Sequence, residues 1–179
     1  MAIASELVSI PESESTFDQL FQTEYRRLVG IAFRVLRDEE EAEDVAQDVL
    51  HSFHQKHDPS APYAAPWLYQ ATAHTALNAL RGKRRRSRWE AESVVQQERI
   101  GSQPDNPEQA ALTAERGLEV RRALSRIPEK SAKVLVLRYS GLSYVEVATA
   151  LGVGVGQIGT LLRRAEQAMR KELGDGTPD

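Results

Sequence analysis

The chain has 179 residues, of which 41% are hydrophobic and 6% aromatic, and it suits one medium domain or two small helical ones rather than one large core. It has no cysteine, which excludes disulfides, thiol nucleophiles and cysteine-ligated zinc, and favours a reducing cytoplasm. The formal net charge is -3, but acidic residues gather at 38–48 and basic residues at 81–88, so we expect different partners on different faces.

Residues 1–15 combine acidic side chains with no Lys or Arg, and they contain no long apolar stretch. This composition is not that of a secretory signal, and no later apolar run approaches the length of a membrane span. We therefore expect a disordered N-terminal segment and a cytoplasmic protein that does not bind a membrane.

Two amphipathic helices are predicted between residues 16 and 57. Thr16 with Gln19 forms a capping-box pattern, and apolar residues then recur at helical spacing to about Arg37. Asp38 can cap the second helix together with Glu41. An acidic strip on the outer face of that helix is either solvated, as such strips usually are, or binds a partner. The expected inner residues are Ala42, Val45, Ala46, Val49, Leu50 and Phe53, and the expected strip is Glu43, Asp44, Gln47, Asp48 and His51.

A metal site is one alternative for this second helix, because Asp48, His51 and His54 are spaced three residues apart and His57 follows. One helix supplies only part of a ligand set, and no second ligand-bearing motif occurs elsewhere in the sequence. We therefore expect ordinary histidines at a helix end and no metal.

Residues 58–66 contain three prolines, so they end the second helix as a loop that presents Tyr63 for stacking. Pro66 suits the first position of a third helix that can run to Leu80. One face of this helix should pack, and the other should carry polar groups able to bond base edges before a basic run able to hold a phosphate backbone. The alternative is a solvated face with a solubilising helix end. The packing residues are Tyr69, Ala73, Ala76, Leu77 and Leu80; the polar ones are Gln70, His74, Asn78 and Arg81, followed by Lys83, Arg84, Arg85, Arg86 and Arg88.

Residues 89–107 mix charges with glycine and prolines, a composition that breaks helices and buries little, so we predict a linker there. Helical periodicity resumes at Glu108 and ends before Pro128, and a buried helix should follow over residues 131–139. The expected packing residues of the first of these helices are Val120, Ala123, Leu124 and Ile127.

The C-terminal sequence has the signature of a helix-turn-helix. Ser143 with Glu146 makes a capping box for a short helix to Leu151, and Gly152 and Gly154 supply a tight turn. A long amphipathic helix should then cover residues 156–173. Its expected buried residues are Ile158, Leu161, Leu162, Ala165 and Met169, and its expected exposed residues are Gln157, Thr160, Arg163, Arg164 and Gln167, with Arg170 and Lys171 beyond.

Two stretches resemble the extracytoplasmic-function group of bacterial RNA polymerase sigma factors. AEDVAQDVL, the proline-broken loop and WLYQATAHTALNALRGKRRR resemble region two, and RIPEKSAKVLVLRYSGLSYVEVATALGVGVGQIGTLLRRAEQAMRKEL resembles region four. The resemblance implies an all-α fold of two small helical domains, region two at residues 16–88 and region four at 108–175. By the same likeness, the linker at 89–107 would either thread toward the active-site and RNA-exit channels of the polymerase or be an idle spacer.

The resemblance also implies roles for residues. The chain would bind core polymerase through the β′ clamp helices and the β flap. It would bind promoter DNA both as a duplex and as a melted single strand. An anti-sigma factor is a further partner that the resemblance implies. His74 departs from the Asn usual in the family, so the resemblance does not fix the base identity read at the minus-ten element. Gly159 and Leu161 stand where basic residues are usual, so we expect an upstream consensus looser than the minus-ten consensus. The residues implied are Asp44, Gln47 and Asp48 for the polymerase; Tyr63, Trp67, Gln70, His74, Asn78, Arg81, Arg84 and Arg85 for the minus-ten element; and Gln157, Thr160, Arg163, Arg164 and Gln167 for the upstream element.

The function expected from this resemblance is promoter recognition and melting by binding alone, with no catalytic residue, cofactor or metal. Two other classes stay open at the level of sequence. A helix-turn-helix regulator would bind duplex DNA without polymerase, and a helical adaptor would bind only proteins. A metal-dependent enzyme is the weakest alternative.

Overall fold

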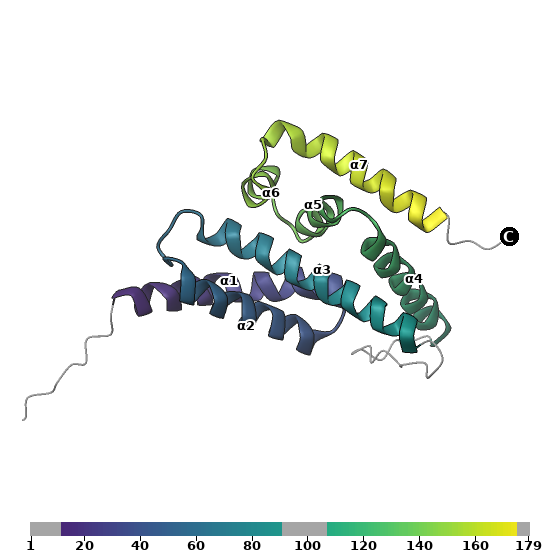
Figure 1. Ribbon diagram of the computed structural model, residues 1–179, viewed down its shortest axis with the longest axis horizontal. Helices are drawn as coiled ribbons and strands as arrows, with labels where there is room; N and C mark the ends of the chain where they lie inside the picture. Colours follow the sequence, from purple (N-terminus) through teal and green to yellow (C-terminus); the bar gives the residue numbers. More distant parts are fainter. Residues whose placement is uncertain (1–11, 91–106, 175–179) are drawn as a thin grey trace, which may run out of the picture.

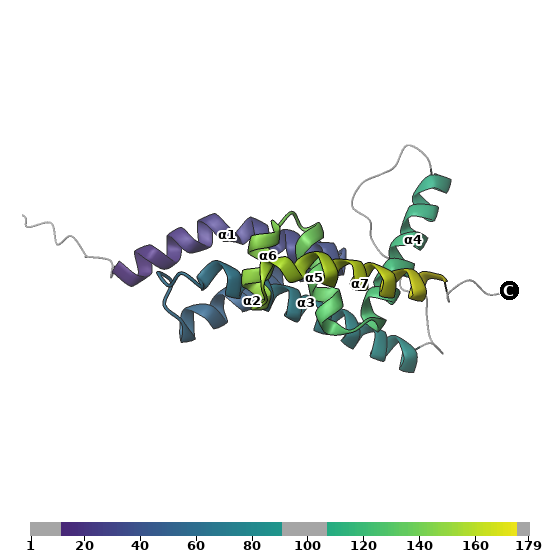
Figure 2. The same ribbon diagram turned by 90° about the horizontal axis from the view of Figure 1, so that it is seen from above.

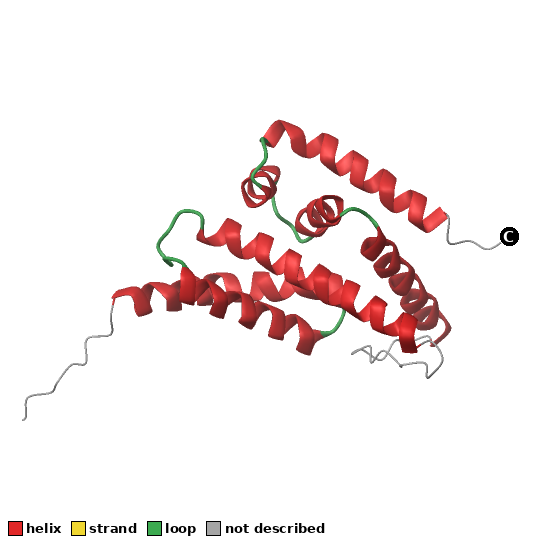
Figure 3. Cartoon of the chain, viewed as in Figure 1, coloured by secondary structure: helices red, strands yellow, loops and turns green. Residues whose placement is uncertain are grey.

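The computed structural model describes residues 12–90 and 107–174, and every regular element in these two ranges is an α-helix (Figure 3). Three helices form the N-terminal half and four the C-terminal half, as the fold class predicted. They are α1 (Glu12–Leu36), α2 (Glu39–Lys56), α3 (Ala64–Glu90), α4 (Pro107–Arg126), α5 (Glu129–Tyr139), α6 (Tyr144–Leu151) and α7 (Val155–Gly174).

The helix α1 begins earlier than predicted. It starts at Glu12, so Thr16 lies inside the helix, and the expected capping box at Thr16 is wrong. Residues 12–15, which were expected to be disordered, belong to the helix because the sequence ESES contains no helix breaker and places acids in the first turn, where the helix dipole favours them. The other end agrees with the prediction: α1 ends at Leu36, and the Oδ1 of Asp38 accepts a hydrogen bond from the Glu41 N–H at 2.9 Å as the cap of α2.

The helix α3 is longer than predicted at both ends. It starts at Ala64, which still leaves Pro66 in the first turn, where its missing N–H costs no hydrogen bond. It continues past Leu80 through the basic run to Glu90, because Arg and Lys are good helix formers and Gly82 alone does not stop a helix. The basic residues are therefore arranged around a rigid helix. What remains of the predicted linker, residues 91–106, lies outside the described residues, as do residues 1–11.

The core of the N-terminal half forms where α1, α2 and α3 pack along their apolar faces. All six residues predicted for the inner face of α2 are buried, and so are all five predicted for α3. Burying each large apolar side chain contributes roughly 1.5 to 3 kcal/mol, so these faces fix how the three helices lie against one another. The largest fully buried side chains of this half are Leu28, Ile31, Leu50, Phe53, Leu68 and Leu77.

The C-terminal half follows the predicted helix-turn-helix closely. Ser143 Oγ accepts from the Glu146 N–H at 3.2 Å, and Glu146 Oε2 accepts from the Ser143 N–H at 2.7 Å, so both bonds of the capping box are present. Gly152 ends α6 in the left-handed conformation with φ 63°, which a residue with a Cβ rarely adopts. The chain then bends by 89° between α6 and α7, close to the angle typical of helix-turn-helix units.

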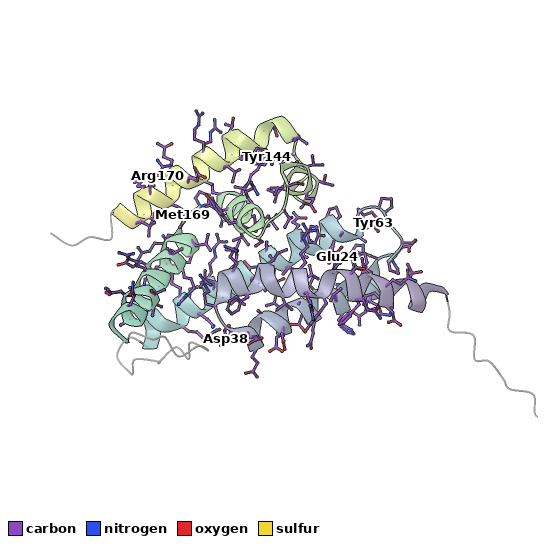
Figure 4. All side chains as sticks on the ribbon, turned by 180° about the vertical axis from the view of Figure 1, so that it is seen from behind. Glu24, Asp38, Tyr63, Tyr144, Met169 and Arg170 are labelled. Carbon is purple, nitrogen blue, oxygen red and sulfur yellow. The ribbon has the colours of Figure 1, made fainter. Side chains whose placement is uncertain are left out.

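Three burial predictions in this half need correction. Val120 is 45% exposed because it lines an open groove between α4, α5 and α7, whereas Ala123, Leu124 and Ile127 near the end of α4 are buried. Leu161 and Met169 pack against the core but are only partly buried. Met169 lies in the same groove, where α7 passes α4 (Figure 4).

The two halves pack against each other through α3. This helix lies between α1 and α2 on one side and α5 and α6 on the other, and α7 is outermost (Figure 1, Figure 2). Apolar residues from both halves form one continuous core. Within the described ranges no single helix is both long and apolar enough to cross a bilayer, and α6 with α7 meets those criteria only as a bent pair.

Candidate nucleic-acid interface

The acidic strip predicted on α2 lies on the surface. Asp44, Gln47 and Asp48 are exposed, because the inner face of the same helix is held in the core. Gln47 Nε2 donates to the Tyr25 hydroxyl at 3.5 Å, which connects the strip to α1. Lys83 on α3 reaches α2, where its Nζ lies 2.6 Å from Oε2 of Glu41 in the first turn. The strip therefore presents carboxylates on a surface that is rigid underneath and open to a basic partner.

The histidines of α2 make three different contacts. His51 bonds the Gln55 side chain at 2.9 Å, and the His54 ring lies 4.2 Å from the Phe17 ring. The ring of His57, the residue that caps the end of α2, contacts both Phe53 and Trp67. Among the residues that the structure describes, no three His, Asp or Glu side chains are grouped as a metal ion would require.

An aromatic cluster supports the loop between α2 and α3. Trp67 is half-buried against Phe53 and His57, with ring centroids 5.3 and 4.7 Å away. Tyr63, the last residue before α3, meets the His57 ring edge-on and is 48% exposed (Figure 4). The loop is also held by Asp58, whose Oδ1 accepts from the Ser60 hydroxyl and N–H, and these bonds lower the pKa of Asp58. An exposed ring on a rigid support can stack on an unpaired base.

The polar face of α3 carries a chain of hydrogen bonds that crosses to the other half of the molecule. His74 Nδ1 is 2.7 Å from Glu129 Oε1, and Asn78 Nδ2 is 3.0 Å from His74 Nε2. A carboxylate only accepts, so Nδ1 carries the proton, and Nε2 then accepts from the amide: one neutral tautomer satisfies both bonds. Glu129 also accepts a hydrogen bond from Lys133. That bond is the larger cause, and the bond from His74 the next, of a pKa of Glu129 lowered to about 2.

The arginines that follow on α3 meet the end of α4. Arg81 Nη2 donates to the Ile127 carbonyl at 3.3 Å, and its Nη1 lies 3.8 Å from Glu129 Oε2. Arg84 Nη1 donates to the Ser125 carbonyl at 3.3 Å, while Arg85 is exposed. Part of the set predicted for the minus-ten element thus lies at a junction with the other half rather than on an open face, whereas Tyr63 and Trp67 lie at the other end of α3. These residues and Ser125 line a cationic pocket of about 350 Å³; they are Asn78, Arg81, Arg84 and Arg85.

The outer face of α7 is fully open. All five residues predicted to read the upstream element are exposed, and the opposite face is anchored by Ile158, Leu162 and Ala165. Gly159 is also exposed on this helix, so the surface offered to DNA near its start is small and uncharged. The guanidinium groups follow one turn later. The exposed residues are Gln157, Thr160, Arg163, Arg164 and Gln167.

Comparisons with known proteins agree with this arrangement of helices. The family model of Sigma-70 region 2 matches residues 20–86, and that of Sigma-70 region 4 matches residues 117–169. The RNA polymerase sigma-H factor of Pseudomonas aeruginosa is 30% identical over 167 residues, which cover 88% of this chain and 86% of that protein. The ECF RNA polymerase sigma factor SigE of Mycolicibacterium smegmatis is 27% identical over 161 residues. The chain belongs to the extracytoplasmic-function group of sigma factors.

The sigma factor aligns with SigE over 88% of its own length and 62% of the length of SigE. Two solved structures share its fold. One is RpoE of Bartonella quintana in complex with the anti-sigma factor NepR, with a TM-score of 0.53 at 19% identity, covering 90% of this chain and 98% of that one. The other is CnrH in complex with the cytosolic domain of CnrY, with a TM-score of 0.54 at 20% identity, covering 92% and 91%.

Sequence reasoning missed a second polar network in this sigma factor. The Tyr69 hydroxyl donates to Glu24 Oε2 at 2.7 Å and accepts from Arg27 Nη1 at 2.8 Å. Arg27 Nη2 then bonds Glu146 Oε1 at 2.8 Å, which reaches the cap of α6 in the other half. Glu24 and Arg27 are two of several charged residues on the amphipathic helix α1, so the sequence did not single them out. Their partners, 45 and 119 residues away, could not be assigned from spacing.

Proposed function

We propose that the chain binds core RNA polymerase, directs it to promoters and holds the minus-ten element open, and that it does so by binding alone, without catalytic chemistry. Region two would be residues 16–88 and region four residues 108–175, and of the linker predicted at 89–107 the helices α3 and α4 leave residues 91–106. The observation that carries the proposal is that one chain presents three separate polar surfaces, each on a helix whose opposite face is buried: the acidic strip on α2, the polar face of α3 and the outer face of α7.

Asp44, Gln47 and Asp48 would dock on a basic surface of the β′ clamp helices, with the β flap contacting region four. Acidic side chains on a rigid helix suit such a partner, since charge complementarity raises association rates and fixes the orientation of docking. A helix-turn-helix regulator acting without polymerase would leave this strip and most of α1 to α3 without a role. A cytoplasmic location follows from the proposed partner.

Tyr63, Trp67 and Gln70 would meet the melted strand at the start of α3, and His74, Asn78, Arg81, Arg84 and Arg85 would continue along it. Unstacking one base costs a few kcal/mol, which stacking on an exposed ring and bonds to base edges can offset. Arg84 and Arg85 suit the phosphate backbone. The pocket of about 350 Å³ beside them supports this assignment, because its lining is rich in guanidinium groups.

Gln157, Thr160, Arg163, Arg164 and Gln167 on α7 would hold upstream duplex DNA. Because Gly159 adds no side chain near the start of the helix and Leu161 is partly occupied by packing, we expect fewer base contacts and a looser upstream consensus than at the minus-ten element. An anti-sigma factor is a further proposed partner. Of the two solved structures named above, RpoE is in complex with the anti-sigma factor NepR, and CnrH is in complex with the cytosolic domain of CnrY.

Run-off transcription with core polymerase on a randomised promoter library tests the proposal. We expect specific transcripts, a defined minus-ten element and a looser upstream element. Joint replacement of His74 and Asn78 by Ala should reduce transcription from duplex promoters more than from templates with a pre-opened bubble. Equal losses on both templates would indicate a folding defect, and failure of the wild-type chain to bind core polymerase in a pull-down would favour the regulator.

A further inference from the structure

The groove between α4, α5 and α7 has an apolar floor that the proposed function leaves unused. Its volume is about 530 Å³, which falls within the roughly 300 to 1,000 Å³ of small-molecule sites. Two large side chains that line it keep much of their surface in solvent, since Val120 is 45% exposed and Tyr139 is 55% exposed. None of the residues that line the groove is among those proposed to contact polymerase or DNA.

The floor of the groove follows α4 for about two helical turns. Gly117, Val120 and Leu124 line it at helical spacing, and at 1.5 Å per residue this run is roughly 11 Å long. Leu135 on α5 adds to the apolar surface, and Met169 adds to it where α7 passes α4 (Figure 4). The shape is therefore that of a narrow apolar channel rather than a flat patch.

The size of the groove favours a small ligand over a protein. Twelve residues line it, whereas a stable protein interface uses about 20 to 30 residues a side. Gly117 keeps one end of the floor open, because a Cβ added there would meet only the guanidinium of Arg121, at 3.5 Å. An extended hydrocarbon chain fits such a floor, and burying its methylene groups supplies the affinity.

The rim of the groove is cationic. Four of the lining residues are arginines and one is a glutamate. That glutamate, Glu166, accepts from the Tyr139 hydroxyl at 3.1 Å and lies 3.9 Å from Arg170. Among the side chains that the structure describes, no carboxylate pairs with Arg34 or Arg37 at the end of α1. The rim thus suits one further carboxylate, which guanidinium groups bind well.

The backbone at Arg37 gives an independent indication. Arg37 has a φ of 57°, and within residues 12–90 and 107–174 it is the one residue other than glycine with a positive φ. A residue with a Cβ adopts this conformation at a cost, and glycine, which has none, is the usual residue after the end of a helix. An arginine kept in a strained position beside the groove is expected where its side chain has a task.

We propose that the groove is a binding site for a free acyl carboxylate, an unbranched hydrocarbon chain that ends in a carboxylate. The chain lies along α4, and the carboxylate meets Arg34 and Arg37. Because α1 belongs to one half of the molecule and α4, α5 and α7 to the other, one bound ligand contacts both halves.

Calorimetric titration of the full chain with decanoate, below its micelle concentration, tests the proposal. Acetate has the carboxylate without the chain, and decyltrimethylammonium has the same chain with the opposite charge. We expect saturable one-to-one binding of decanoate and at least tenfold weaker binding of the other two. An acidic amphipathic helical peptide is titrated in parallel, as a probe for a protein partner.

Two variants separate the head of the ligand from its chain. Arg37→Gly removes a guanidinium and relieves the left-handed backbone, so it should be at least as stable as wild type yet bind decanoate about three- to tenfold more weakly. Gly117→Leu fills the floor without weakening α4 and should bind at least tenfold more weakly. The control is Arg26→Ala, an exposed arginine of α1 that does not line the groove, and it should bind like wild type. Circular dichroism confirms that each variant is folded.

The proposal is overturned if decanoate does not saturate the wild-type chain, or if decyltrimethylammonium binds as tightly. It is also overturned if the folded Arg37→Gly and Gly117→Leu variants bind decanoate like wild type. Binding of the acidic peptide in place of decanoate would make the groove a protein-docking surface and overturn it as well. Core binding and transcription by the wild-type chain test the proposed function separately.

Discussion

Removing one oxygen from Tyr69 should destabilise the whole N-terminal half. The side chain is 3% exposed, and its hydroxyl both donates to Glu24 and accepts from Arg27. Burial, and then the bond to Glu24, raise the pKa of the phenol, so the hydroxyl stays protonated and remains a donor throughout the usable pH range. Tyr69→Phe keeps the ring and its packing and deletes only these two bonds.

The size of the effect follows from what is left behind. Glu24 is only 9% exposed and loses its donor, and a buried acceptor without a partner costs about 1 to 3 kcal/mol, more when it is charged. Arg27 is half-buried and keeps its bond to Glu146, so water can replace the lost bond there. We expect a decrease of about 2 to 3 kcal/mol in the free energy of unfolding.

Urea unfolding followed by circular dichroism measures this decrease. The matched control is Tyr25→Phe: Tyr25 is only partly buried, and its hydroxyl accepts one long bond, 3.5 Å from Gln47 Nε2. The control should change the free energy of unfolding by no more than about 0.5 kcal/mol. If Tyr69→Phe costs no more than Tyr25→Phe, Glu24 is satisfied by water, and the network that we describe contributes no net stability.

Three further outcomes are expected. Asp48→Arg should weaken binding to core polymerase about tenfold in a titration, with normal folding, while Asp18→Arg on α1 should not; equal affinities would remove the strip from the interface. Arg164→Ala should weaken upstream DNA binding and reduce the salt slope by about 1, whereas Arg116→Ala on α4 should leave both unchanged. The packing of the two halves against each other should also be acid-sensitive: the pKa of Glu129 lies at about 2, below its ordinary 4.5, so the stability that Glu129 adds to this packing is complete above pH 4.5 and is lost as the pH falls toward 2. The radius of gyration should increase over that range, and a constant radius would contradict the assignment.

Local features of the fold were predictable because local sequence determines them. Asp38, Ser143 and Gly152 act where they were expected, since caps and left-handed turns depend on residues within one helical turn. The ends of α1 and α3 were harder, because a start at Glu12 and a continuation through the basic run depend on small propensity differences that no single residue marks.

Contacts between the two halves could not be predicted. Glu129 follows Pro128 at the start of α5, and in the sequence it is an ordinary acidic residue of a first helical turn. Its partner His74 lies 55 residues earlier, so spacing could not pair the two. The polar face of α3 was correctly found from its periodicity, but periodicity does not say which surface will cover it. Val120 shows the same limit, because its spacing placed it on the packed side of α4 and only the divergence of α4 from its neighbours exposes it.

The way α2 and α3 are joined has a mechanical consequence. The acidic strip of α2 and the helix α3, which we propose holds the minus-ten strand, belong to one packed unit, since their inner faces share a core and Lys83 pairs with Glu41 at 2.6 Å. If the strip binds the polymerase, the packed helices fix the distance between the polymerase surface and the opened DNA strand. Repacking the core beneath α3, for instance with Leu77→Phe, would then shift the position of the first transcribed nucleotide without altering any residue proposed to touch either partner.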